Sequence, residues 1–293
     1  MFLFIHGVGA TRTLWLSQIR AALGFGSEID DKTLIDLFTI SLPGHPSNDS
    51  SFTIQDCEKS ILEFETRTRP LQKQIALKMS LTHRPEIIKS LIDPKLIIVG
   101  HSLGAVIAID FSLKYNQKVK KLIIISCGTR FSKWSIGLFF DIFIFKFLVK
   151  INRQWLSKIQ KKKISLRHKI LLDILLENSK HSGLKSGLKI TKQYDFEKLF
   201  QQLSLNQQLD FLKIPVLAIQ GRYDLFNSIN SSIKLENLVD HKTPIFQTKK
   251  TILDNITPTN HSNFSLKIYK TGHYPMDDDL VRFVLDTQEF LRK

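Results

Sequence analysis

Short apolar runs rich in β-branched residues alternate along this chain with longer amphipathic segments. In Leu122-Ile123-Ile124-Ile125 no residue is polar, which suits a strand covered on both faces. This alternation is typical of an α/β fold, with a mostly parallel sheet and helices on both faces. We expect strands at Phe2–Ile5, Leu34–Ser41, Lys95–Val99, Lys121–Ser126, Pro215–Gln220 and Phe264–Tyr269, and helices at Thr13–Leu23, Ile54–Thr66, Pro70–Ile92 (with Pro85 as a candidate break), Leu103–Tyr115 and Asp277–Leu291.

A segment of different composition interrupts this alternation between Thr129 and Lys213. It carries 17 Lys and Arg against 6 Asp and Glu, a large part of the net charge of +15. Its apolar run, residues 136–149, is shorter than the about 20 residues of a membrane-spanning helix and contains two charges. We therefore expect a core of residues 1–128 and 214–293 and a helical insertion over residues 129–213. A second, polar segment, residues 240–263, is typical of an irregular excursion.

A GxSxG pattern stands in the sequence Val99-Gly100-His101-Ser102-Leu103-Gly104-Ala105, between an expected strand and an expected helix. A serine in such a tight turn needs small neighbours, because the strained backbone has to push the hydroxyl into the open. The N–H of Leu103 and the positive end of the helix dipole would then point toward a negatively charged oxygen. The pattern indicates a nucleophile at Ser102. The competing interpretation is a glycine turn in which this serine only caps the helix.

A serine nucleophile requires a histidine base and an acid that orients the base. Asp224 follows the expected strand Pro215–Gln220, and His273 follows the expected strand Phe264–Tyr269. Both therefore stand at carboxyl ends of strands, in the chain order Ser, Asp, His that such enzymes use. We predict a catalytic triad of Ser102, His273 and Asp224. Considered alone, Asp224 or His273 could also be an ordinary turn or surface residue.

The first expected strand ends in the glycine-containing loop His6-Gly7-Val8-Gly9. The N–H of Val8 is our candidate for a second oxyanion donor, beside that of Leu103, so both residues are predicted to bind substrate. A dinucleotide- or phosphate-binding loop is the competing interpretation. Neither GxGxxG nor GxxxxGK[ST] is present, which argues against it.

These motifs together resemble the α/β-hydrolase superfamily, in its cap-bearing branch of small esterases and lipases. The matching pieces are FLFIHGVG, ISLPGHPSN, IIVGHSLGAVIA, IPVLAIQGRYD and YKTGHYPMDD, and they cover most of residues 1–128 and 215–293. The resemblance implies an α/β-hydrolase fold with a helical cap at residues 129–213. It also implies acyl transfer, since dehalogenases and epoxide hydrolases of this superfamily use an aspartate nucleophile where this chain has Ser102.

We expect a serine hydrolase that cleaves a small-molecule carboxylic ester with an apolar acyl or aromatic group. Aromatic residues of the insertion would line the pocket; they are Phe131, Trp134, Phe139, Phe140, Phe143, Phe145, Phe147 and Trp155. Several alternatives stay open: a C–C bond hydrolase, a thioesterase or other acyl-transfer enzyme, and a lysophospholipid or monoacylglycerol hydrolase at a membrane surface. A binding protein without activity is a further alternative, but such proteins usually lack a triad residue.

The charges and cysteines bear on partners and cofactors. The basic run at residues 158–163, with Arg167 and Lys169 beyond it, would allow peripheral contact with an anionic membrane, and a solvated helix face is the alternative. Nucleic acid is not expected, because the aromatic residues are not interleaved with the basic ones. Cys57 and Cys127 lack zinc-site spacing, so we expect no metal or other cofactor. Without a basic leader before the apolar N-terminal run, we expect a cytoplasmic protein.

Overall fold

The structure is a computed structural model that describes residues 1–26, 28–45, 53–79, 85–128, 187, 189–190, 214–224, 227, 229–230, 232 and 263–293. The expected helical cap at residues 129–213 lies outside these residues, apart from 187 and 189–190. The expected excursion at residues 240–263 lies outside them too, apart from its last residue. Both expectations, and the division into two units, therefore stay predictions.

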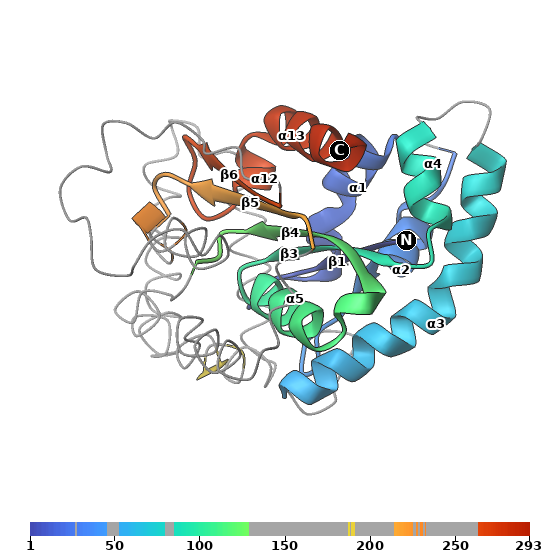
Figure 1. Ribbon diagram of the computed structural model, residues 1–293, viewed down its shortest axis with the longest axis horizontal. Coiled ribbons are helices and arrows are strands. Elements are labelled where there is room, and N and C mark those ends of the chain that lie inside the picture. Colours follow the sequence, from blue (N-terminus) through green and yellow to red (C-terminus); the bar gives the residue numbers. More distant parts are fainter. Residues whose placement is uncertain are drawn as a thin grey trace, which may run out of the picture.

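In the described part of the chain, six strands form one sheet in the order β2-β1-β3-β4-β5-β6 (Figure 1). Every neighbouring pair of strands is parallel. Because parallel strands end at the same edge of a sheet, the loops that follow β1, β3, β4, β5 and β6 gather there. The predicted parallel α/β sheet is confirmed. The bounds of the strands are β1 Phe2–Ile5, β2 Thr39–Ile40, β3 Leu96–His101, β4 Val119–Ile125, β5 Val216–Gly221 and β6 Phe264–Tyr269.

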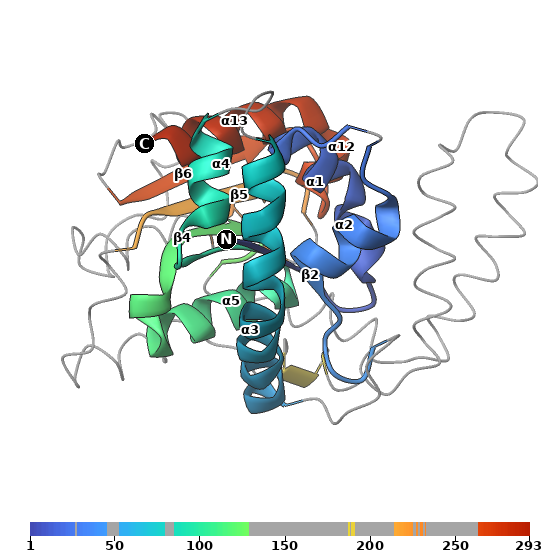
Figure 2. The same cartoon turned by 90° about the vertical axis from the view of Figure 1, so that its right-hand side faces the viewer.

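Helices cover both faces of this sheet (Figures 1 and 2). One layer contains α5 and the first half of α3, and the other contains α1, α2, α4 and α13. The long helix α3 runs from one layer to the other. None of the helices in these ranges has both the length and the hydropathy needed to cross a bilayer. The bounds are η1 Arg12–Trp15, α1 Leu16–Leu23, α2 Asp31–Phe38, α3 Ile54–Met79, α4 Pro85–Ile92, α5 Leu103–Lys114, η2 Asn116–Lys118, α12 Pro275–Asp278 and α13 Leu280–Arg292.

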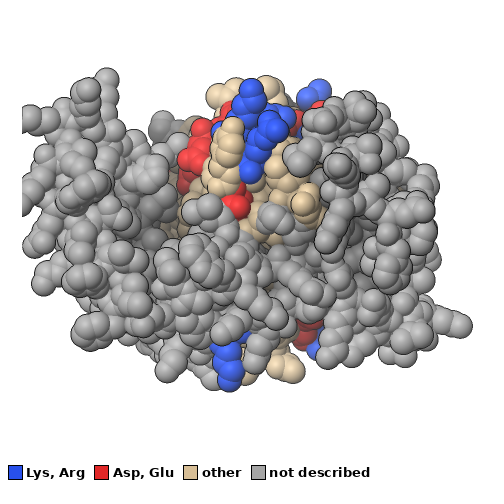
Figure 3. Space-filling view, turned by 90° about the vertical axis from the view of Figure 1, so that its left-hand side faces the viewer, with Lys and Arg blue, Asp and Glu red and all other residues tan. Residues whose placement is uncertain are grey.

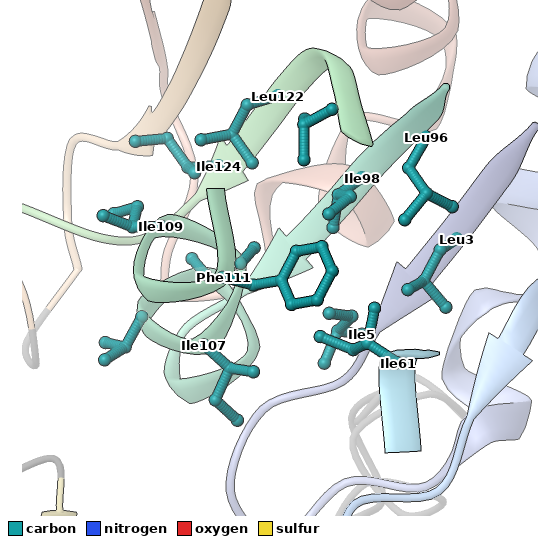
Figure 4. Packing of buried hydrophobic residues seen from close by; sticks show 14 of the residues in the cluster. Leu3, Ile5, Ile61, Leu96, Ile98, Ile107, Ile109, Phe111, Leu122 and Ile124 are labelled. Atoms are coloured by element: carbon teal, nitrogen blue, oxygen red, sulfur yellow. The ribbon is translucent and has the colours of Figure 1, made fainter. Parts of the chain in front are cut away.

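Two apolar clusters, one on each face, hold the layers to the sheet. In β4, Leu122 and Ile124 belong to the cluster on the α5 side, whereas Ile123 and Ile125 belong to the opposite one. Phe111 of α5 lies in the first cluster, shown in Figure 4. Burying one such side chain stabilises the fold by about 1.5–3 kcal/mol. The apolar run of β4 thus has the two covered faces that its sequence indicates.

The expected strand Leu34–Ser41 is wrong for most of its length, because helix α2 continues to Phe38 and β2 has only two residues. Asp30 caps this helix: its carboxylate accepts a hydrogen bond from the N–H of Thr33 at 2.9 Å. A short apolar run by itself fits a helix as well as a strand, so the cap and the spacing decide. The buried apolar side chains recur at helical spacing: Leu34, Leu37 and Phe38.

The expected helix boundary between residues 66 and 70 is also wrong, since α3 passes through Pro70 without ending. Proline lacks the N–H that would bond to the carbonyl of Thr66. Both residues are exposed, so water can satisfy that carbonyl. A new helix does begin at Pro85, as expected, because proline suits the first turn of a helix.

Candidate active site

Ser102 occupies the tight turn between β3 and α5, where its backbone has φ 52° and ψ −117°. A positive φ in a residue with a side chain costs about 1–3 kcal/mol and persists only where the surroundings hold it. Here the N–H of Ser102 donates to the carbonyl of Ile125 at the end of β4 (2.9 Å). Its own carbonyl accepts from the N–H groups of Ala105 and Val106 in α5. The strained turn is therefore fixed from both the sheet and the helix.

Glycines allow the loop after β1 to lie directly against this turn. A Cβ on Gly104 would overlap the carbonyl oxygen of Ile5, and a Cβ on Gly7 would lie 3.0 Å from the Cβ of Ser102. Neither glycine has a positive φ. The small residues expected beside the serine are thus required by close backbone approach, more than by strain in the glycines themselves.

The two predicted oxyanion donors come directly after the two residues that approach each other here, Gly7 and Ser102. Val8 follows Gly7, and Leu103 follows Ser102 as the first residue of α5. Within the described ranges, neither N–H donates to a backbone or side-chain acceptor. The dipole of α5 adds partial positive charge at Leu103. Both N–H groups therefore stay candidates for donors to an oxyanion.

His6 supports the loop after β1, a role that the sequence analysis did not predict. Its ring is buried, with Nδ1 2.9 Å from the carbonyl oxygen of Gly7. Its Nε2 accepts from the N–H of Leu42 at 3.2 Å, so the proton is on Nδ1. Burial, followed by the neighbouring ring of His45, lowers the pKa of His6 to about 3. The ring is thus neutral and joins the loop after β1 to the loop after β2.

The structure brings Asp224 and His273 into direct contact. Nδ1 of His273 lies 2.9 Å from each carboxylate oxygen of Asp224. The Asp224 side chain is fully buried, and 13% of the His273 side chain is exposed. The carboxylate also accepts from the Nε2 amide of Gln220 (3.0 Å) and from the N–H of Asn227 (3.2 Å). A carboxylate beside Nδ1 favours the tautomer with the proton on Nδ1, in which Nε2 is the nitrogen that can accept a proton.

Ser102 is brought to the His273 loop through its chain neighbour. Nε2 of His101 lies 2.8 Å from the carbonyl oxygen of His273, and the centroids of the two rings are 4.8 Å apart. As far as the structure describes the chain, no group hydrogen-bonds to Oγ of Ser102. Catalytic hydrogen bonds of this kind are often long until a substrate binds. The three candidate residues therefore share one edge of the sheet, with one direct side-chain contact among them.

Two further buried residues of this edge, Gln220 and Ser126, escaped the sequence-based predictions. Gln220 is the residue before the last of β5, and Ser126 directly follows β4 and donates through Oγ to the carbonyl of His273 (2.9 Å). The only signal in the sequence is a polar residue at the end of an apolar strand. Ser126 acts on a loop that follows another strand, and Gln220 acts on the loop that follows its own strand, through Asp224 and Asn227. No motif in the sequence marks either role.

The face toward which the strands end is shown in Figure 3. On the part of it that the structure describes, Lys and Arg side chains lie beside Asp and Glu side chains. The basic and aromatic residues expected to form the cap surface and the pocket lie outside the described residues. Within the described ranges, no three His, Cys, Asp or Glu side chains are grouped so that they could hold a metal ion.

Comparison with known proteins agrees with this architecture. A family model described as the alpha/beta hydrolase fold matches residues 1–254. The chain is 30% identical over 236 residues to pimeloyl-[acyl-carrier protein] methyl ester esterase of Wigglesworthia glossinidia brevipalpis, covering 76% of this chain and 74% of that protein.

Similar solved structures include an enol-lactonase from Burkholderia xenovorans (TM-score 0.60, 12% identity, 100% of this chain and 92% of that one). Another is a meta-cleavage product hydrolase from Pseudomonas fluorescens (TM-score 0.53, 15% identity, covering 99% of this chain and 90% of that one). At such identities these structures bear on the fold alone. The parallel sheet, the serine turn after β3 and the family match lead to one conclusion: the chain belongs to the α/β-hydrolase family.

Proposed function

We propose that this protein is a serine hydrolase that cleaves carboxylic esters through an acyl-enzyme, with Ser102, His273 and Asp224 as its triad. The observation that carries the proposal is the strained turn at Ser102, next to a histidine loop whose ring is held by a buried carboxylate. Strain at a positive φ is typical of functional sites. A buried carboxylate on Nδ1 is the arrangement that prepares an imidazole to act as a base.

In the proposed reaction, Oγ of Ser102 attacks the ester carbonyl carbon while Nε2 of His273 takes the hydroxyl proton. The negative charge of Asp224 stabilises the imidazolium that forms. The N–H groups of Val8 and Leu103 donate to the oxyanion of the tetrahedral intermediate. The imidazolium then gives its proton to the leaving alcohol as the C–O bond breaks. Water, deprotonated by the same imidazole, attacks the acyl-enzyme, releases the acid and restores the serine.

The relative at 30% identity suggests a narrower substrate class. That protein is a pimeloyl-[acyl-carrier protein] methyl ester esterase, so a methyl ester of an acyl chain on a carrier protein is the first substrate to test. Such a substrate fits the apolar ester expected from the sequence. Contact between the basic residues 158–169 and an anionic membrane also stays a prediction, since those residues lie outside the described ranges.

Labelling with a fluorophosphonate probe, followed by peptide mapping, tests the nucleophile and its activation together. We expect the label on Ser102, and Ser102→Ala to lose labelling and about 10⁴-fold or more of its ester hydrolysis. Ser112→Ala is the matched control, because that serine lies in α5, the helix that follows Ser102, and its Oγ donates to the carbonyl of Ala108 (2.7 Å). Label on another residue, or full hydrolysis by Ser102→Ala, would refute the proposal.

A substrate panel separates ester hydrolysis from its alternatives. It should contain methyl esters of acyl chains, free and carrier-bound, aryl esters, acyl thioesters and a vinylogous diketone for C–C cleavage. We expect the highest kcat/KM on an ester. Cleavage of the thioester or the diketone, with no ester hydrolysis, would keep the triad but replace the proposed reaction.

A further inference from the structure

The backbone carbonyl of His273 accepts hydrogen bonds from two buried side chains at the ends of other strands. Nε2 of His101, the last residue of β3, lies 2.8 Å from this oxygen, and Oγ of Ser126, just after β4, lies 2.9 Å from it. We propose that His101 and Ser126 are positioning residues, which hold the loop of the catalytic base so that its ring meets Ser102. This inference rests on the proposed function, because it assigns the base role to His273.

The chemistry of His101 supports a role as a fixed donor. Because its partner is a carbonyl oxygen, the proton must be on Nε2. Burial, followed by the neighbouring His273, lowers the pKa of His101 to about 3, so the ring stays neutral. Its Nδ1 is buried and, among the described residues, lacks a hydrogen-bond partner, which destabilises the folded protein. A phenyl ring would pack here without that cost, so the Nε2–H is what the imidazole adds.

The ring of His101 is also held in place by its neighbours. The ring centroid of Tyr274 lies 4.8 Å from it, and Nδ1 is only 2.9 Å from where a Cβ on Gly7 would stand. A donor packed this tightly cannot follow its acceptor if the acceptor moves. His101 therefore defines where the carbonyl of His273 rests.

The backbone conformation of Ser126 supports a positioning role as well. It is fully buried, its φ is 51°, and its N–H donates to the carbonyl of Ile219 in β5 (2.9 Å). Glycine would adopt this backbone without strain. Serine is strained in this conformation, but unlike glycine it carries a hydroxyl, and this hydroxyl donates to the carbonyl of His273. Both positions thus carry an energetic penalty that their bond to this one oxygen explains.

The backbone of His273 needs such support because it lies outside the hydrogen-bonded strands and helices. His273 lies between the end of β6 and the start of α12, in neither a strand nor a helix. Asp224 orients the ring through Nδ1, but the position of the ring also depends on the backbone that carries it. A misplacement of about 1 Å at a reacting group can lower a rate by about 100-fold. Since His101 adjoins Ser102, the same turn that presents the nucleophile also anchors the base.

Three variants test this inference against the wild type. His101→Phe keeps the ring and removes the donor, His101→Gln keeps an amide donor near the position of Nε2, and Ser126→Gly removes the hydroxyl without adding strain. For each, we would measure the rate of fluorophosphonate labelling of Ser102, kcat and KM, and the midpoint of thermal unfolding. We expect labelling and kcat to fall about 10- to 100-fold in His101→Phe and Ser126→Gly, with KM little changed. His101→Gln should recover part of the loss.

The outcomes separate this inference from the proposed function. If the wild type is not labelled, the proposed function fails and this inference fails with it. If the wild type is labelled, and His101→Phe and Ser126→Gly react as fast, the positioning role alone is overturned. Loss of activity only in step with loss of folding, without recovery in His101→Gln, also overturns it. Should His101→Phe not fold, Ser126→Gly decides, because glycine fits the backbone at that position.

Discussion

Nδ1 of His273 lies 2.9 Å from both carboxylate oxygens of Asp224, a contact that joins the loop after β6 to the loop after β5. The acid is fully buried, so water screens this interaction little. Gln220 and Asn227 donate to the same carboxylate, which limits its rotation. The acid is thereby fixed in the orientation that keeps the imidazole proton on Nδ1.

Asp224→Asn tests the electrostatic part of this contact. The amide keeps the size of the side chain but carries no charge, and its N–H₂ favours the wrong tautomer of His273. We expect kcat to fall by about 10³- to 10⁴-fold, with a smaller change in KM. Asp93→Asn is the control, because that residue precedes β3 at the opposite edge of the sheet and pairs with Lys120. Equal kcat in Asp224→Asn and the wild type would contradict the assignment of the acid.

Gly221 and Gly272 face each other where these two loops meet, but only one of them leaves no room for a methyl group. A Cβ on Gly221 would overlap the carbonyl oxygen of Gly272, whereas a Cβ on Gly272 would meet nothing within 4 Å. We expect Gly221→Ala to lower the free energy of unfolding by about 1–3 kcal/mol. Gly272→Ala should change it by no more than about 0.5 kcal/mol. Urea unfolding of both variants checks this, and equal losses would contradict it.

The sequence was sufficient to predict the sheet and the loops that carry the candidate site. Runs such as Leu122–Ile125 are apolar because both faces of the strand are covered, and a parallel sheet brings the loops after its strands to one edge. The predictions failed where two local structures suit the same pattern. Asp30 and its cap made a helix of residues 31–38, which the apolar run alone did not reveal.

The supporting residues of the site could not be predicted in this way. The bond from His101 to the His273 carbonyl joins residues 172 positions apart, and the Ser126 bond to the same oxygen joins residues 147 apart. Gln220 acts closer along the chain, on Asp224 and Asn227 in the loop that follows its own strand. Such roles follow from which strand ends meet in space, and a single sequence carries no period or motif that encodes them.

Lys121 gives a test of stability at the opposite edge of the sheet. Its buried Nζ donates to the carbonyls of Phe290 and Leu291 in the last turn of α13, both at 2.9 Å. These carbonyls lack donors within the helix, and a cation suits this end of the helix dipole. Burial, followed by the charge of Lys120, lowers the pKa of Lys121.

We expect Lys121→Met to lower the free energy of unfolding by about 1–3 kcal/mol, because two carbonyls lose their buried donor. Lys120→Met is the matched control: its ion pair with Asp93 is partly exposed and contributes about 0–1 kcal/mol. Ester hydrolysis by the folded fraction should be unchanged in both variants, since the site lies at the other end of β4. Chemical denaturation at one pH measures the difference, and equal losses in the two variants would contradict it.

His6 predicts how stability depends on pH. Burial, followed by the ring of His45, lowers its pKa in the folded protein from 6.5 to about 3. As the pH falls below about 6.5, the unfolded chain binds a proton that the folded protein does not bind. This proton stabilises the unfolded state relative to the folded one. The contribution of His6 to stability is therefore complete above about pH 6.5 and is lost between about pH 6.5 and 3, by at most about 1.4 kcal/mol per pH unit.

The variant His6→Gln removes this titration and keeps an acceptor for the N–H of Leu42. Its free energy of unfolding, measured in urea between about pH 5 and 7, should rise with pH less steeply than that of the wild type. The difference in slope should correspond to at most one fewer proton taken up on unfolding. His101→Gln should flatten the slope in the same sense, because burial and the neighbouring His273 also lower the pKa of His101 to about 3. A slope unchanged in both variants would mean that these rings accept protons in the folded protein, and the neutral His6 that supports the loop after β1 would have to be abandoned.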